Sequence, residues 1–281
     1  MKRLSFFAVL LAFLLPSCEE IPPVINPIMG PIEDTTTVDV TNQKRQVLIE
    51  EFTGVRCVQC PAGAVEIENL KLIHGDQLVA VSIHAGGFAP PFNESNYDFR
   101  TDEGEDLLNF LGQPFGYPSA VVDRKLFPDE FDLQLSKGQW PGFIADEKQI
   151  DPKVKIGLEV SFDGGTRKLD VDVTLFVQEN ITDEDVRLTV LITEDGIVDV
   201  QDTPDGKVEE YEHNHVMRDM FTSYDGNALT TPMLTGDEVI KSYSMTIPAD
   251  WVVGNCHVVA FVNLGGASKE VLQAHEVKLS E

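Results

Sequence analysis

Two cysteines separated by two residues carry the clearest chemistry in this sequence. Cys57 and Cys60 stand in the run TGVRCVQCP, residues 53–61, directly after an apolar strand pattern and before a helical one. At a helix start, free N–H groups and the helix dipole stabilise a thiolate on the first cysteine. We therefore expect Cys57 to be the more exposed, nucleophilic thiol and Cys60 to be the resolving thiol. Arg56 adds a positive charge next to Cys57.

Two other interpretations of this motif need weighing. A C-x-x-C pair can be half of a zinc site, but no second C-x-x-C or closely spaced Cys/His pair lies nearby in the sequence. We therefore predict no metal at the cysteines. A purely structural disulfide between Cys57 and Cys60 is the alternative that stays open.

Strand and helix patterns alternate around the cysteines. Short apolar runs predict strands at 46–52, 78–83 and 120–123. Apolar residues at intervals of three to four predict helices at 61–74, 105–111 and 140–150. This alternation predicts an α/β domain over residues 44–151.

A strand followed by C-x-x-C at a helix start, with a distant Gly-Tyr-Pro-Ser (116–119) before another strand, resembles the thioredoxin superfamily. The resemblance implies a cis Tyr117–Pro118 peptide bond and places Pro118 opposite Cys57. It also implies that the backbone of Tyr117 hydrogen-bonds an extended substrate. This sequence has Arg56 where the family usually has Trp, which leaves its redox potential and partners open.

The same resemblance implies a buried acid six residues before the first cysteine. Glu51 stands at that spacing from Cys57, and a buried carboxylate there can accept a proton from the second thiol. An exposed position at a strand edge is the alternative for Glu51.

A polar, Pro- and Gly-rich loop over residues 84–102 follows the second predicted strand. Its start should lie at the strand edge that carries the cysteines. His84, Phe88 and Phe92 are therefore candidate substrate contacts at the rim, and His84 is a candidate proton shuttle. A surface insertion with packed aromatic side chains explains the loop equally well.

Residues 152–281 have a different pattern, in which apolar and polar residues alternate at 155–162, 168–178 and 186–193. Further strands are expected at 239–247, 257–263 and 271–278, which predicts an all-β sandwich. Residues 196–236 are the least regular stretch, and we expect a loop there. His213 and His215 share a face if extended, but no third metal ligand is fixed by spacing.

The N-terminus has the pattern of a targeting segment. Lys2 and Arg3 precede an apolar run at 4–15, which is too short to span a bilayer and suits a signal peptide. The run ends at LPSC (15–18), which resembles the lipobox of bacterial lipoproteins. The resemblance implies a signal peptide at 1–17, lipidation of Cys18 and membrane anchoring through it. An ordinary secreted protein with an unmodified cysteine is the alternative. Residues 18–43 are Pro-rich and predict a tether.

The composition excludes several partners. The chain has 281 residues, with 21 Lys and Arg against 47 Asp and Glu, giving a net charge of −26. This balance argues against nucleic acid and against electrostatic adhesion to anionic lipids. No P-loop or dinucleotide fingerprint is present, so we predict no cofactor. Cys256 opens an apolar strand, where we expect a buried free thiol.

Taken together, the lipobox, the tether and the runs EEFTGVRCVQCPAG, FGYPSAVVDR and YEHNHVMRDMF closely resemble outer-membrane lipoproteins of the Omp28 type. The resemblance implies a thioredoxin-like domain followed by a β-sandwich, anchored at the outer membrane. The first functional hypothesis is thiol–disulfide exchange with envelope or surface proteins through Cys57 and Cys60. The alternative is a surface binding or adhesion lipoprotein with a static disulfide. The sequence does not determine the oligomeric state.

Overall fold

The strands and helices expected around the cysteines are present, with shifts of a few residues at their ends, in a computed structural model that describes residues 38–183 and 185–280. The strands in this part are β1 (Val47–Thr53), β2 (Leu78–His84), β3 (Ser119–Val122) and β4 (Leu135–Ser136). The helices are α1 (Cys60–His74), α2 (Asp102–Leu111) and α3 (Trp140–Glu147).

β1 and β2 form the centre of an α/β layer. They run parallel, with Glu51 opposite Ser82, and β3 pairs antiparallel with the other edge of β1. Every residue of β1 and β2 is buried, because helices cover both faces. α2 packs on one face and α1 and α3 on the other. The start of α2 is fixed by Thr101, whose side-chain oxygen accepts from the backbone N–H of Gly104 at 3.0 Å.

The second half of the chain contains the expected sandwich. Six long strands contribute to it: β5 (Val154–Asp163), β6 (Lys168–Val177), β7 (Val186–Glu194), β12 (Glu238–Thr246), β13 (Cys256–Leu264) and β14 (Val271–Lys278). β12, β6 and β5 form one antiparallel sheet, and its apolar face packs against β7 and β13 of a larger sheet. Burial alternates along β6, as the period-two pattern predicts.

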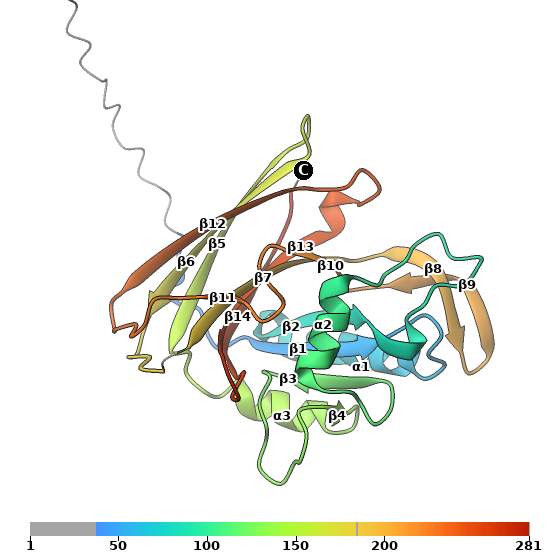
Figure 1. Cartoon of the computed structure of the whole chain (residues 1–281), viewed down its shortest axis with the longest axis horizontal. Coiled ribbons are helices and arrows are strands. Elements are labelled where there is room, and N and C mark those ends of the chain that lie inside the picture. The colour runs from blue at the N-terminus through green and yellow to red at the C-terminus, as the bar shows by residue number, and fades with distance from the viewer. Residues whose placement is uncertain (1–37, 184, 281) are drawn as a thin grey trace, which may run out of the picture. The chain divides into compact units, whose positions relative to one another are not determined.

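The expectation of a loop over residues 196–236 is wrong. This stretch forms β8 (Ile197–Thr203), β9 (Gly206–His213), β10 (Val216–Met220) and the short β11 (Asn227–Ala228). β8 and β9 form a two-stranded ribbon, seen at the right of Figure 1. Most of β9 is exposed and polar, so its sequence lacks the apolar alternation that reveals a half-buried strand.

One sheet joins the two halves of the sequence (Figure 1). Its strand order is β14-β13-β7-β10-β2-β1-β3-β4, with β11 on β7. β10 lies between β7 and β2, and the backbone N–H of Ser82 donates to the carbonyl of His215 at 2.7 Å. Described residues from Val38 onward belong to one compact unit. The domain boundary after residue 151 stays a prediction. Hydrogen bonds and core contacts connect the residues on its two sides.

Candidate functional site

A disulfide closes the turn between β1 and α1. Cys57 and Cys60 are bonded to each other, and their Cα atoms are 5.3 Å apart. α1 begins at Cys60, and Pro61 suits its first turn because proline lacks the N–H that a helix start leaves unpaired. No acidic side chain stands in that first turn, so none offsets the positive end of the helix dipole there.

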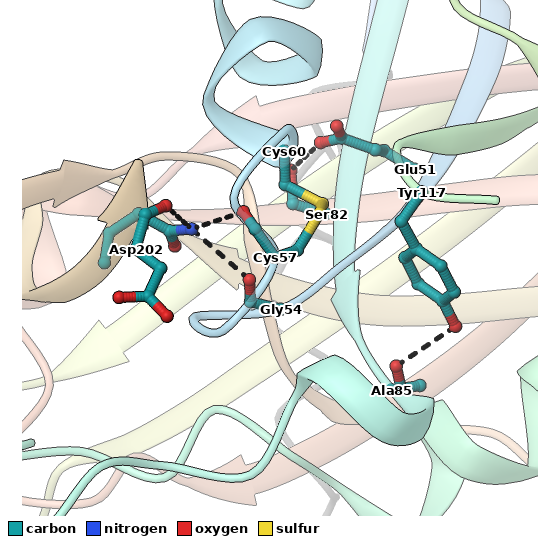
Figure 2. Close-up of a disulfide and its surroundings, with 9 residues drawn as sticks. Glu51, Gly54, Cys57, Cys60, Ser82, Ala85, Tyr117 and Asp202 are labelled. Atoms are coloured by element: carbon teal, nitrogen blue, oxygen red, sulfur yellow. Dashed lines mark hydrogen bonds between the residues drawn. A yellow bond between two sulfur atoms is a disulfide. The ribbon is translucent and has the colours of Figure 1, made fainter. Parts of the chain in front are cut away.

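Strand β8 covers this disulfide from the second half of the chain. The Gln201 side-chain amide donates to the carbonyl oxygen of Cys57 at 3.0 Å, drawn as a dashed line that ends on Cys57 in Figure 2. The Asp202 N–H donates to the carbonyl oxygen of Val55 at 2.8 Å. Only 3% of Cys57 and 2% of Cys60 is exposed. Cys57 was expected to be the more exposed of the two cysteines, but in this oxidised state both are buried, because a strand distant in sequence lies over the turn.

Glu51 is buried on the face of β1 that packs under α1. The Ser82 hydroxyl donates to its Oε2 at 3.4 Å, and Oε1 has no hydrogen-bond partner among the described residues (Figure 2). Burial raises the pKa of Glu51 to about 8, against the hydrogen bond from Ser82 and the charge of His215, which both lower it. The carboxyl group is therefore protonated at neutral pH. Its predicted burial is confirmed, and its role in proton transfer stays a prediction.

A close helix contact seals this position. A side chain on Gly63 would collide with the Glu51 carboxyl and with Pro118, so α1 can approach both groups only because this residue is glycine. The Tyr117–Pro118 peptide bond is cis, as the thioredoxin resemblance implies. Pro118 and the Glu51 carboxyl group therefore both pack against Gly63 of α1, about one helical turn after Cys60.

The face of β1 and β2 under α1 changes from apolar to polar along its length. Its first inward side chains are Val47, Ile49, Leu78 and Ala80, which pack in the α1 core. Its next inward side chains are polar, and because alternate residues share a face and the two strands are in register, they lie together. These four residues are Glu51, Thr53, Ser82 and His84.

A cavity of about 460 Å³ opens beside the disulfide, over these four polar side chains. One wall is the first part of α1, from Cys60 to Asn69. The opposite wall is Gln201 together with residues 211–215, at the end of β9 and the start of β10. Both halves of the sequence therefore build the site. The residues from the second half could not be placed beside the cysteines from any local sequence pattern.

Two neutral histidines meet in this cavity. The rings of His84 and His213 are 5.7 Å apart, and each lies 4.8 Å from the ring of Phe99. Burial lowers the pKa of both imidazoles, that of His213 to about 4. His84 is only 4% exposed, so its expected place on the rim is wrong: the 84–102 loop and β9 cover it. Each ring keeps one nitrogen without a hydrogen-bond partner among the described residues.

His215 differs from its neighbour, because two carboxylates hold it. Burial alone would lower its pKa, but hydrogen bonds to Asp195 and Glu68 raise the pKa to about 9. Its Nδ1 lies 3.2 Å from Asp195 and its Nε2 lies 3.1 Å from Glu68. The imidazolium is therefore charged and fully partnered. Within the described ranges, no group of three His, Cys, Asp or Glu side chains is arranged to hold a metal ion.

Arg56 and Tyr117 hold the loop that follows β2. The Arg56 guanidinium donates to the carbonyls of Pro90 and Pro91 and lies 4.3 Å from the ring centroid of Phe92. The Tyr117 hydroxyl donates to the carbonyl of Ala85 at 3.3 Å. The loop start therefore lies beside the cysteine turn, as predicted. The binding of a substrate by Arg56 and Tyr117 stays a prediction.

Of the two remaining cysteines, Cys256 is among the described residues and Cys18 is not. Cys256 is a buried free thiol, which confirms its predicted state. Cys18, the expected signal peptide and most of the expected tether lie outside the described residues. Among residues 38–183 and 185–280, no helix is long and apolar enough to cross a membrane.

The protein therefore has an α/β layer and a β-sandwich that share one sheet. Its candidate site is a C-x-x-C disulfide at the start of a helix, beside a polar cavity. The model of the family Outer membrane protein Omp28 matches residues 113–281. The chain belongs to this family, which associates it with the outer membrane. The matched region begins after the cysteine pair, so membership does not bear on redox chemistry.

Two solved structures were compared with the fold. HBP35 of Porphyromonas gingivalis is 17% identical, with a TM-score of 0.65 over 84% of this chain and 76% of that chain. A domain of the outer membrane lipoprotein Omp28 from Porphyromonas gingivalis is 20% identical, with a TM-score of 0.32 over 46% of this chain and 96% of its own. The first similarity supports the fold alone. A search of curated protein sequences found no match.

Proposed function

We propose that residues 44–151 form a thioredoxin-like segment and that the Cys57–Cys60 pair exchanges disulfides with envelope or surface proteins. The observation that carries this proposal is the placement of a helix-capped C-x-x-C disulfide beside a buried carboxyl group, Glu51, with a free oxygen. Thiol exchange that is coupled to proton transfer requires an acid with a shifted pKa next to a cysteine pair that can be oxidised and reduced.

The exchange step can be written from the oxidised form. A thiolate of a partner dithiol attacks Sγ of Cys57, which forms a mixed disulfide and breaks the Cys57–Cys60 bond. The Cys60 thiolate that leaves takes a proton from the Glu51 carboxyl, which is protonated at neutral pH. The second partner thiol then loses its proton and attacks the partner sulfur of the mixed disulfide, and the Cys57 thiolate that leaves takes up that proton. The proton lost by the first partner thiol returns the Glu51 carboxylate to its acid form. The partner is oxidised to a disulfide, and Cys57 and Cys60 are reduced to thiols; the reverse sequence reduces a partner disulfide.

Burial of the pair adds a condition to this mechanism. β8 must move away from the cysteine turn before a protein thiolate can reach Cys57, because Gln201 and Asp202 hold β8 against that turn. The hydrogen bonds concerned are few, and each contributes about 1 kcal/mol net. Local opening of the β8–β9 ribbon is therefore accessible without unfolding of the sheet.

We further propose that the chain is a lipoprotein anchored at the outer membrane through Cys18. The lipobox-like run ending at this residue and membership of an outer membrane family support the anchor. Replacement of Cys18 by alanine should block lipidation and move the protein from the membrane fraction to the soluble fraction. Retention of the variant in the membrane without added lipid mass would contradict the proposal.

Trapping in cells tests the exchange function. Cys60→Ser leaves Cys57 without its resolving thiol, so a mixed disulfide with the partner should accumulate and appear on non-reducing gels. The double variant that also carries Cys57→Ser is the matched control and should trap nothing. Absence of adducts from Cys60→Ser at normal protein levels would count against exchange.

Burial of the disulfide favours a second candidate function, a surface binding or adhesion protein with a static disulfide. With both cysteines at most 3% exposed, the pair can serve to fix the β1–α1 turn against β8. In that case removal of both thiols should lower the free energy of unfolding by roughly 2 kcal/mol, because the loop that the disulfide closes is short, and should trap no partner. Trapped partners would instead favour exchange.

A further inference from the structure

A second cavity, of about 470 Å³, lies where the α/β layer meets the sandwich. It is lined by residues 43–45 before β1, residues 148–152 after α3, Lys155 of β5 and residues 178–179 after β6. Its volume lies within the range of small-molecule sites, roughly 300–1,000 Å³. It shares no lining residue with the cavity beside the disulfide, so it is a separate place for a ligand.

The lining of this second cavity has the opposite charge balance to the whole chain. The chain has 21 Lys and Arg against 47 Asp and Glu, whereas cationic side chains outnumber carboxylates in the lining. The cations are Lys44, Arg45, Lys148 and Lys155, and the carboxylates are Asp151 and Glu179. Arg45 forms a buried ion pair with Asp123 at 2.8 Å, so the excess positive charge comes from the lysines.

Arg45 keeps an open hydrogen-bond donor beside the cavity. Its Nη2 donates to Asp123 at 2.8 Å and to the carbonyl of Val271 at 2.6 Å. Its Nε is fully buried and cannot reach a ligand. Its Nη1 has no hydrogen-bond partner among the described residues and, unlike Nε, keeps accessible surface. Because only 4% of this residue is exposed, its guanidinium is held in place before any ligand binds.

Two lysines of the lining have free N–H groups. The Lys44 side chain is exposed and forms no hydrogen bond or ion pair with another described residue. Nζ of Lys155 donates to the carbonyl of Thr41 at 2.7 Å, which leaves two further N–H groups. Lys148 is less available, because its Nζ lies 3.0 Å from Nδ1 of His74. Several charged donors around one space suit a phosphate group, which has several acceptor oxygens.

The two carboxylates of the lining are unpaired as well. Asp151 and Glu179 are exposed, and neither side chain forms an ion pair or hydrogen bond within the described ranges. The lysines and carboxylates of the cavity therefore do not neutralise each other by direct contact. A ligand that carries both a phosphate and an ammonium group can pair with both sets of charges at once.

We propose that this second cavity binds a ligand in which a phosphate group lies close to an ammonium group, as in phosphoethanolamine. Lys44, Arg45 and Lys155 hold the phosphate, and Asp151 and Glu179 hold the ammonium. Free phosphoethanolamine and the headgroup of phosphatidylethanolamine share this chemistry. The proposal depends neither on exchange at the disulfide nor on the lipid anchor.

Three small probes separate the contributions of the two charges. Phosphoethanolamine carries both groups, ethyl phosphate lacks the ammonium and ethanolamine lacks the phosphate. In calorimetric titrations at neutral pH, phosphoethanolamine should bind with a Kd of about 1 mM or below. Ethyl phosphate should bind about two- to fivefold more weakly and ethanolamine at least about tenfold more weakly. The titrations use the full-length chain with Cys18→Ala, so that no acyl chain of the protein itself takes part.

Substitutions of solvent-accessible side chains locate the site. Lys44→Gln and Lys155→Gln should each weaken the binding of phosphoethanolamine and of ethyl phosphate alike, by about two- to fivefold. Asp151→Asn should weaken only phosphoethanolamine, by a similar factor, because ethyl phosphate has no ammonium group. Lys241→Gln, at an exposed position of β12, is the control and should change nothing.

A short-chain lipid distinguishes the two sources of the ligand. Ile150 lines the cavity and is 47% exposed, so it offers apolar surface to the glycerol and acyl part of a lipid. Tighter binding of dihexanoyl phosphatidylethanolamine than of phosphoethanolamine would assign the cavity to a lipid headgroup. Weaker binding of this lipid would assign it to a free ligand.

NMR on the chain with an unaltered cavity keeps the test independent of the variants. Addition of phosphoethanolamine should shift the backbone amide signals of Lys44, Gln149 and Lys155, which all belong to lining residues. No binding of phosphoethanolamine, equal binding of ethanolamine, unchanged affinity in both lysine variants, or shifts confined to other regions would overturn the proposal. Equal binding of ethyl phosphate would overturn the role of the carboxylates.

Discussion

Replacement of Glu51 by glutamine should make the protein more stable at neutral and alkaline pH. In the folded protein this carboxyl group has a pKa of about 8, whereas its ordinary value is 4.5. Burial is the main cause, and the hydrogen bond from Ser82 and the charge of His215 only partly oppose it. Glutamine has nearly the same shape, stays neutral at every pH and can still accept from Ser82.

The sign and size of the effect follow from proton linkage. Between the two pKa values the folded protein binds a proton at Glu51 that the unfolded chain does not. The stability associated with this group is therefore fully present below pH 4.5 and is lost as the pH rises towards about 8. Because one pKa unit corresponds to about 1.4 kcal/mol, the loss amounts to roughly 3 kcal/mol at neutral pH and roughly 5 kcal/mol above the folded pKa.

The assay is denaturant unfolding of the natural protein and of Glu51→Gln from about pH 4 to about pH 9. The difference in unfolding free energy should be small at the acid end and grow in favour of the variant as the pH rises. His213 and His215 titrate in both proteins, so the difference isolates Glu51. Glu209→Gln, at an exposed position, should follow the natural protein. Parallel pH profiles, or a variant that is less stable at high pH, would refute the buried, protonated carboxyl group.

Three further outcomes are expected. Gln201→Ala removes the amide that holds β8 to Cys57, so the disulfide should be reduced by dithiothreitol about 2- to 10-fold faster; an unchanged rate in a stopped-flow thiol assay would contradict the covering role of β8. Arg124→Met leaves the buried carboxylate of Glu50 unpaired, and chemical denaturation should show a loss of about 3–5 kcal/mol; a loss below about 1 kcal/mol would contradict the buried pair. Cys256, whose pKa burial raises to about 12, should resist alkylation in the native protein and react after unfolding, as judged by mass spectrometry; rapid native labelling would contradict its burial.

Local patterns were sufficient to predict the α/β elements and the sandwich strands. The apolar run of β1, the helical spacing after Pro61 and the alternation along β6 each depend on residues close together in the sequence. The burial of Glu51, by contrast, was implied by the thioredoxin resemblance, which expects an acid at this spacing from the first cysteine. The change from apolar to polar side chains along β2, at Ser82, was a further sequence signal that could have located the site.

The assembly of the cavity beside the disulfide from distant segments could not be predicted from local sequence patterns. β10 pairs with β2 through Val216 and Ser82, which are distant in sequence, and nothing local specifies such a contact. β9 is polar on both faces, so it resembles a loop in sequence. Gln201 and His213 therefore could not be placed beside Cys57 in advance, nor could the burial of His84 beneath them.

The reduction potential of the Cys57–Cys60 pair in the full-length protein tests the central claim most directly. Thiol trapping after equilibration with a series of glutathione buffers measures it. Exchange with envelope proteins predicts a potential among those of known oxidoreductases, about −120 to −270 mV. A potential below about −300 mV, typical of structural disulfides, would contradict exchange and leave a binding protein with a static disulfide.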